Sequence, residues 1–177
     1  MKKILFVVAH PHLSDSRANR FIVAQLKNLP NVTYHNLYDR YPYFHIDYRN
    51  EQELLLRHDM IFLQHPFYWY SMPPLLKMWI DEVFKFGFAY GPQGEALKGK
   101  DFQISITTGG GAEAYAPSGY NKRNIEDYLT PYVQTADLCQ MPWGKPFIFY
   151  LASRASDRHL LEHADEIKTF FEKYVSL

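Results

Sequence analysis

Three short segments of this 177-residue chain carry residue types that could bind a ligand. The first, residues 10–19, reads HPHLSDSRAN and places serine and aspartate just before an expected helix. Free amide groups at a helix amino terminus attract anions, so Ser16, Arg17 and Asn19 could hold a phosphate monoester. Helix caps are far commoner than phosphate sites, and from this segment alone simple capping is the favoured interpretation.

The second segment places four aromatic residues in a row, Phe67, Tyr68, Trp69 and Tyr70. Such side chains are costly to leave in water, and a planar heterocycle gains buried area and offset stacking against them. A hydrophobic anchor for the following helix, or a subunit interface, explains this segment equally well when it is taken alone.

The third segment reads TTGGG at residues 107–111. Consecutive glycines let the backbone approach a ligand closely and permit positive φ. Tyr115 follows this segment and could donate a proton or a hydrogen bond to a bound substrate. The commoner fate of such a tyrosine is a place in the core.

Apolar runs predict the strands that must position these segments, at residues 3–9, 32–37, 60–63, 102–107 and 146–151. Helices are predicted from Ser16 to Leu29 and over residues 49–58, 75–84, 121–137 (with a break near Pro131) and 156–174. Residues 38–48 are expected to form an irregular connector, and residues 87–100 a glycine-bearing loop that could include a short hairpin.

This alternation indicates a single α/β domain over residues 1–177, an open five-stranded parallel sheet with helices on both faces. In such sheets ligands bind beyond the carboxyl ends of the strands. Each of the three segments follows a predicted strand, so we expect them to lie together at one edge of the sheet.

Composition excludes several functional classes. Lys and Arg number 19, as do Asp and Glu, and no basic stripe favours nucleic acid. The single cysteine, Cys139, cannot form an internal disulfide and is expected to be buried. No apolar run approaches the roughly 20 residues of a membrane span, so a cytoplasmic protein is expected. No metal site, P-loop, dinucleotide glycine motif or GxSxG elbow is present in the sequence.

The motifs AHP…DSRAN, QHPFYWYSMPPLLKMWID and TTGGG together resemble the flavodoxin-like NAD(P)H:quinone oxidoreductase family. The likeness extends from Lys3 to about Tyr150 and includes GFAYG and LKGK. It is closest to the small bacterial branch, which contains ancillary oxidoreductases of glutathione-gated potassium-efflux systems and general stress proteins. The resemblance implies a flavodoxin-like, flavin-binding domain.

The resemblance also implies a site. The flavin phosphate would be held by His10, Ser16, Arg17, Ala18 and Asn19. The isoalloxazine ring would pack against Phe67, Tyr68, Trp69 and Tyr70, and its pyrimidine edge would contact Thr108, Gly109, Gly110 and Gly111. The cofactor would also be bound by Pro66 and Thr107. Tyr115 matches the position of a catalytic tyrosine in larger quinone reductases. The histidine that those enzymes carry six residues further on is Asn121 here. The long carboxyl-terminal extension of those enzymes is missing, which favours FMN over FAD, although the loops would accept either.

The implied activity is ping-pong transfer of hydride from NAD(P)H to FMN and then to a quinone or similar flat acceptor, in a homodimer with shared sites. One alternative is a flavodoxin-type electron carrier, although carriers are usually strongly acidic. The other is a regulatory flavoprotein subunit of a glutathione-gated potassium-efflux transporter, peripheral to the inner face of the cell membrane.

Overall fold

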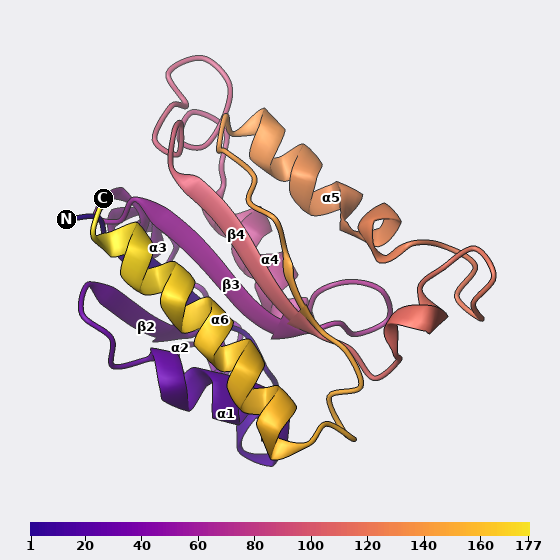
Figure 1. The fold of residues 1–177 in the computed structure, drawn as a ribbon. Helices are drawn as coiled ribbons and strands as arrows, with labels where there is room; N and C mark the ends of the chain where they lie inside the picture. Colours follow the sequence, from indigo (N-terminus) through magenta and orange to yellow (C-terminus); the bar gives the residue numbers. More distant parts are fainter.

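The computed structural model describes residues 1–177 and contains a five-stranded, wholly parallel sheet (Figure 1). The strand order is β2-β1-β3-β4-β5. The strands are β1 (Ile4–Val8), β2 (Val32–Asn36), β3 (Met60–Pro66), β4 (Asp101–Thr107) and β5 (Phe147–Phe149). The predicted fold class is therefore confirmed, although β5 is shorter than its apolar run indicated.

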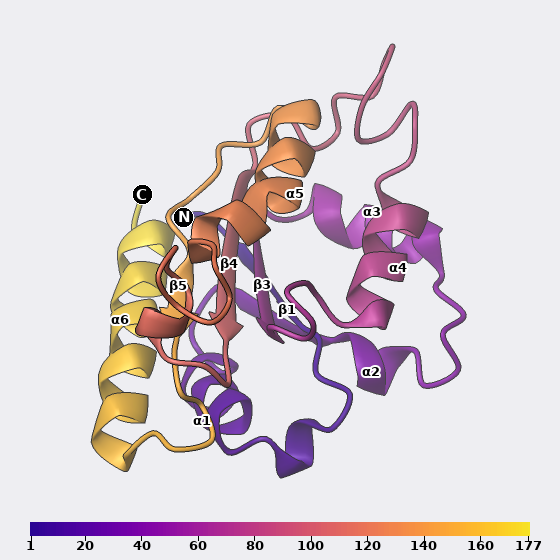
Figure 2. The same ribbon diagram turned by 90° about the vertical axis from the view of Figure 1, so that its right-hand side faces the viewer.

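Helices cover both faces of the sheet (Figure 2). One face packs against α1 (Arg17–Leu26) and α6 (Asp157–Val175), and the other against α3 (Tyr48–Leu56), α4 (Pro74–Val83) and α5 (Ile125–Leu138). Successive side chains of a strand alternate between faces. In β1, Phe6 accordingly joins the α1/α6 core while Leu5 and Val7 join the other. A strand buried on both faces must be apolar throughout, as β1 is.

Two connecting segments differ in detail from the prediction. Residues 37–40 form a short helix, α2 (Leu37–Arg40), where the sequence indicated a strand end and an irregular connector. The side chain of Asn36 caps this helix by accepting a hydrogen bond from the Tyr38 amide at 3.2 Å. Residues 87–100 contain turns, with an isolated bridge between Phe86 and Tyr90, and no hairpin.

Helix α5 also departs from the prediction, because it begins at Ile125 and continues through Pro131 without a break. A proline within a helix leaves the carbonyl four residues earlier without its usual donor. Here the hydroxyl of Thr130 donates to that carbonyl, on Asp127, at 3.0 Å. A capping box between Asn124 and Asp127 fixes the start of the helix.

The strand register brings the three candidate segments together. Val8 in β1 pairs with Gln64 in β3, and Gln64 pairs with Ser105 in β4. The segments that follow these strands therefore leave the sheet at the same edge, as expected, and the Phe67 amide donates to the Thr107 carbonyl at 2.8 Å. None of the helices has the length and hydropathy needed to cross a membrane.

Candidate functional site

A cavity of about 380 Å³ lies at the carboxyl ends of the central strands. It is lined by His10, Asp15, Ser16, Arg17, Ala18, Asn19, Pro66, Tyr68, Thr107, Thr108, Gly109, Ala152 and Ser153. All three predicted segments contribute to this lining. Five predicted cofactor-binding residues do not line the cavity, namely Phe67, Trp69, Tyr70, Gly110 and Gly111.

The amino terminus of α1 forms one wall of the cavity. Ser16 caps the helix, because its Oγ accepts a hydrogen bond from the Asn19 amide at 3.3 Å. The amides of Arg17 and Ala18 donate to no acceptor within the chain. These free N–H groups, at the positive end of the helix dipole, favour an anionic guest.

His10 adds a further donor to this wall. Its side chain is buried, and its Nδ1 accepts a hydrogen bond from the His12 amide at 3.1 Å. Burial and the neighbouring His12 lower the pKa of His10, against a smaller opposing effect of Asp15. The neutral ring therefore carries its proton on Nε2, which can donate one hydrogen bond to a ligand.

The guanidinium of Arg17 is already engaged. It pairs with the carboxylate of Asp157 at 2.5 Å and donates to the carbonyl of Ala155. Arg17 thus ties α1 to the segment that leads into α6. This segment begins with Ala152 and Ser153, which complete the cavity.

The aromatic segment forms a tight turn. The Ser71 amide donates to the Tyr68 carbonyl at 3.0 Å, and the two residues between them both have positive φ, 45° at Trp69 and 63° at Tyr70. Trp69 stands at the tip with 92% of its surface exposed, whereas Phe67 is buried. The segment therefore has a core anchor and a free indole.

The glycine segment does not adopt the positive φ that its sequence suggested, because none of Gly109, Gly110 and Gly111 lies in the left-handed region. A Cβ at Gly110 would meet the Tyr120 hydroxyl, and one at Gly111 would meet the Glu113 carboxylate. A Cβ at Gly109 would meet nothing within 4 Å. The three amides donate to no acceptor within the chain. Both contacts are with the ends of flexible side chains that can move, so neither close approach nor positive φ requires glycine here. The free amides of these residues can donate to a ligand.

Tyr115 lies beside the aromatic segment. Its ring centroid is 6.1 Å from that of Phe67 and 6.2 Å from that of Tyr128. Burial, followed by the neighbouring tyrosines, raises the pKa of Tyr115 to about 12. The phenol is therefore neutral near pH 7 and can donate a hydrogen bond to a ligand. Asn121 accepts a hydrogen bond from the Tyr70 hydroxyl at 3.1 Å, so this position links the aromatic segment to the loop before α5.

Sequence reasoning missed several residues around the site. Ala152 and Ser153 follow the fifth predicted strand, so the rule that selected the other three segments would have found them. Tyr128 stacks on Tyr70 with ring centroids 5.0 Å apart. Tyr128 lies on one face of α5, and no local motif in the sequence distinguishes it from a core residue.

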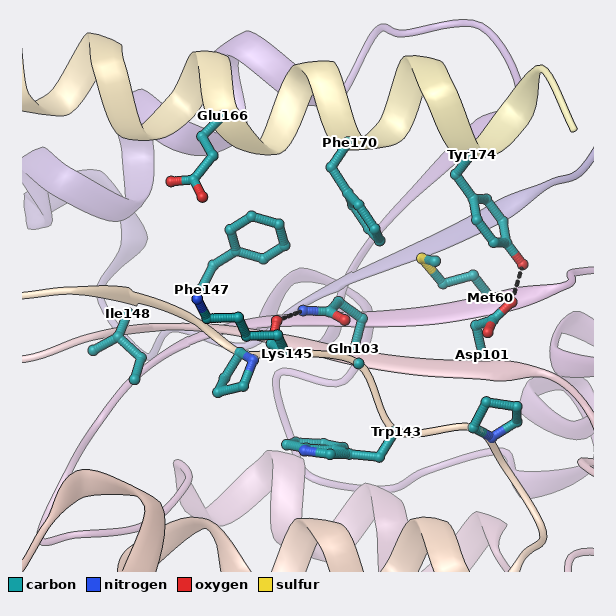
Figure 3. A pocket seen from close by; sticks show the side chains of 13 residues that line it. Met60, Asp101, Gln103, Trp143, Lys145, Phe147, Ile148, Glu166, Phe170 and Tyr174 are labelled. Atoms are coloured by element: carbon teal, nitrogen blue, oxygen red, sulfur yellow. Dashed lines mark hydrogen bonds between the residues drawn. The ribbon is translucent and has the colours of Figure 1, made fainter.

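A larger cavity, of about 550 Å³, lies between α6 and residues 142–148 (Figure 3). Two of the polar side chains there are hydrogen-bonded within the chain. The Tyr174 hydroxyl donates to Asp101 at 2.7 Å, and the amide of Gln103 donates to the Lys145 carbonyl. This cavity is the larger of the two, but its lining includes Met60 and Asp101, the first residues of β3 and β4, so it lies away from the carboxyl edge where the three segments meet.

Comparisons with known proteins agree with this geometry. A family model described as a flavodoxin-like fold matches residues 2–171. The glutathione-regulated potassium-efflux system ancillary protein KefG of Pectobacterium carotovorum is 49% identical over 152 residues, which are 86% of this chain and 83% of the relative.

Two solved structures are also similar. General stress protein 14 of Treponema denticola, in complex with FMN, has a TM-score of 0.92 and 33% identity, covering 97% of this chain and 98% of that one. An NADPH-quinone reductase from P. pentosaceus has a TM-score of 0.83 and 32% identity, covering 93% and 96%.

Proposed function

This chain belongs to the flavodoxin-like fold family, and we propose on that basis that it is an FMN-dependent NAD(P)H:quinone oxidoreductase. The observation that carries the proposal is the convergence of unused hydrogen-bond donors and an aromatic turn at one sheet edge. The proposal is further supported by the FMN-bound stress protein and the NADPH-quinone reductase that this chain resembles.

The residues fit the two chemically different parts of FMN. The free amides of Arg17 and Ala18, the Nε2–H of His10 and the hydroxyl of Ser16 would hold the phosphate, since all are donors on one wall. The free glycine amides would serve the carbonyl-bearing edge of the ring. FAD would use the same phosphate contacts, and we favour FMN because the similar stress protein contains it.

The chemistry that FMN supplies when bound is hydride transfer, which here would serve a nicotinamide donor and then a quinone. The protein's part is to position the flavin and its substrates and to exclude water from the site. Tyr115, neutral near pH 7, would donate a hydrogen bond to the oxygen of the acceptor. The glycine amides would stabilise negative charge on the reduced ring, because these donors are in position before the charge develops.

A homodimer forms part of this proposal. Trp69 and Tyr120 are 92% and 72% exposed, and aromatic side chains at the mouth of a site are costly to leave in water. A second copy that covers them would complete the site. Light scattering of the purified protein gives the stoichiometry, and a monomer at all concentrations would contradict this part.

The deciding experiment is an absorbance spectrum followed by a steady-state assay. We expect a yellow protein with the band of oxidised FMN and NADPH oxidation that menadione accelerates. A flavodoxin-type carrier would bind FMN but would need a separate reductase. A colourless protein that cannot be reconstituted with FMN or FAD would rule out both.

A second function is favoured by the relatives at 49% and 46% identity, which are named as ancillary proteins of a potassium-efflux system. We propose that this chain also binds the cytoplasmic side of such a transporter, which would place it in the cytoplasm at the membrane surface. Co-purification with the co-expressed transporter tests this role independently of enzyme activity. Failure to co-purify, with oxidoreductase activity intact, would leave the enzyme proposal alone standing.

A further inference from the structure

Gln64 occupies an unusual place beside the candidate phosphate wall. It lies on the central strand β3, is completely buried, and does not line the cavity. Its Nε2 donates to the Oδ1 of Asn19 at 2.8 Å, whereas its Oε1 has no partner. The bond to Asn19 is therefore the one interaction that this buried amide makes through its side chain.

That bond fixes the orientation of the Asn19 amide. Because Oδ1 of Asn19 accepts from Gln64, its Nδ2 must face the other way. Nδ2 donates to the Oγ of Ser16 at 3.1 Å and to the Oγ1 of Thr107 at 2.9 Å. A chain of hydrogen bonds thus runs from β3 through α1 to the end of β4, with every donor pointing in one direction.

This direction decides what the two hydroxyls can do. The Ser16 Oγ accepts from both the amide and the side chain of Asn19, which uses both of its lone pairs. The Thr107 Oγ1 also accepts from Asn19. Neither hydroxyl donates to an acceptor in the chain, and both residues line the cavity, so their protons remain available to a ligand there.

We propose that Gln64 is a positioning residue that sets this hydrogen-bond relay, so that Ser16 and Thr107 present protons to a bound phosphate. The inference rests on the proposed flavin site and adds a residue that does not touch the ligand. With the Asn19 amide reversed, the hydroxyls would donate to its Oδ1, and an anion would meet oxygen lone pairs instead.

Riboflavin separates this role from a general contribution to folding, because it lacks the phosphate of FMN. The measured quantity is the ratio of the riboflavin dissociation constant to that of FMN, by fluorescence titration of the apoprotein. We expect Gln64→Met to lower this ratio about tenfold, since one charge-assisted hydrogen bond is worth at least that factor. Riboflavin affinity itself should not change.

Gln103→Met is the matched control. Gln103 is also a buried glutamine on a central strand, and it makes one side-chain hydrogen bond, to the Lys145 carbonyl at the other cavity (Figure 3). Loss of that bond should destabilise the fold to a similar extent and leave the ratio unchanged. An equal fall of the riboflavin-to-FMN ratio of dissociation constants in both variants would overturn the proposed relay.

Gln64→Glu keeps the shape of the side chain and provides a test if Gln64→Met does not fold. A protonated Glu at position 64 can donate to Asn19 as Gln does, but a carboxylate can only accept. Relative to the wild type, FMN affinity of this variant should fall as pH rises, while riboflavin affinity should not. A pH profile equal to that of the wild type would overturn the proposal.

The wild type distinguishes the two levels of inference. If it binds riboflavin as tightly as FMN, the phosphate assignment in the proposed function fails, and the relay fails with it. If it prefers FMN and Gln64→Met retains the full preference, only the relay is overturned.

Discussion

Replacement of Trp69 by Asn should stabilise the protein and weaken its hold on flavin. Trp69 and Tyr70 occupy the two central positions of a tight turn, with φ of 45° and 63°. Such turns favour Asn and Gly, because the left-handed conformation costs other residues about 1–2 kcal/mol each. Trp69 is 92% exposed and its ring packs on no aromatic neighbour, so its removal loses little packing.

The expected gain for Trp69→Asn is about 1 kcal/mol in the free energy of unfolding, which raises the melting temperature of a domain of this size by about 2–4 °C. The same change at Tyr70 should give no gain. Tyr70 stacks on Tyr128 at 5.0 Å and donates to Asn121, and loss of these interactions costs about 1–3 kcal/mol. The sign of the effect therefore depends on what each side chain contacts.

Thermal unfolding of the apoprotein measures stability, and flavin titration measures binding. Trp69→Ala is the control, because it removes the indole but leaves a residue with a Cβ at positive φ. Both Trp69 variants should lose flavin affinity, and only Trp69→Asn should gain stability. A lower melting temperature for Trp69→Asn would show that the indole stabilises the folded chain and would refute the argument from backbone strain.

Three further measurements test other parts of the structure. Tyr115→Phe should slow menadione reduction about tenfold, because it removes one hydrogen bond. The pH profile of the rate between pH 6 and 9 should not change, because the pKa of Tyr115 is about 12. An unchanged rate would exclude Tyr115 from the site. Glu51→Gln should lower the urea-derived free energy of unfolding by about 2–3 kcal/mol, since this buried carboxylate accepts three side-chain hydrogen bonds; a neutral effect would contradict that network. Burial lowers the pKa of His163 from 6.5 to about 4. Between these two pH values the unfolded chain binds a proton that the folded chain does not. The free energy of unfolding therefore falls by up to about 3 kcal/mol as pH drops from 6.5 to about 4. His163→Leu should flatten that slope, and an unchanged slope would place the proton elsewhere.

The parts of this fold that could be predicted from sequence are those in which local and global preferences agree. Residues 4–9 are apolar throughout because the strand they contain is covered on both faces, and that pattern is readable without a structure. The position of the candidate site followed in turn from the rule that parallel strands end at a common edge. Departures arise where one side chain replaces a missing backbone partner, as when Thr130 satisfies the carbonyl that Pro131 leaves free.

The interior of the site was less predictable for a different reason. TTGGG and FYWY each identify a loop, but a motif does not show which residue adopts positive φ, and it was the aromatic pair rather than the glycines that did so. The relay through Asn19 joins residues 45 and 88 positions away in sequence, and no periodicity connects them. Contacts of this kind become visible only once the strand register places Gln64 beside the end of β4.

Several local conflicts in this chain lie where the ligand site is proposed. Of the eight non-glycine residues with positive φ, three directly follow strand ends at the carboxyl edge, namely Trp69, Tyr70 and Leu151. The other five lie in other turns and connectors, namely Asn31, Phe44, Gln93, Lys122 and Gln140. Two of the four buried polar atoms without partners, on Gln64 and its register neighbour Ser105, lie just before the same edge, and the other two are on Tyr38 and His163. A chain selected only for stability would remove such features, since each costs about 1–3 kcal/mol. The features at this edge support binding there without reference to any motif. At Trp69 the backbone conformation costs stability, while the exposed indole is the group proposed to contact the flavin.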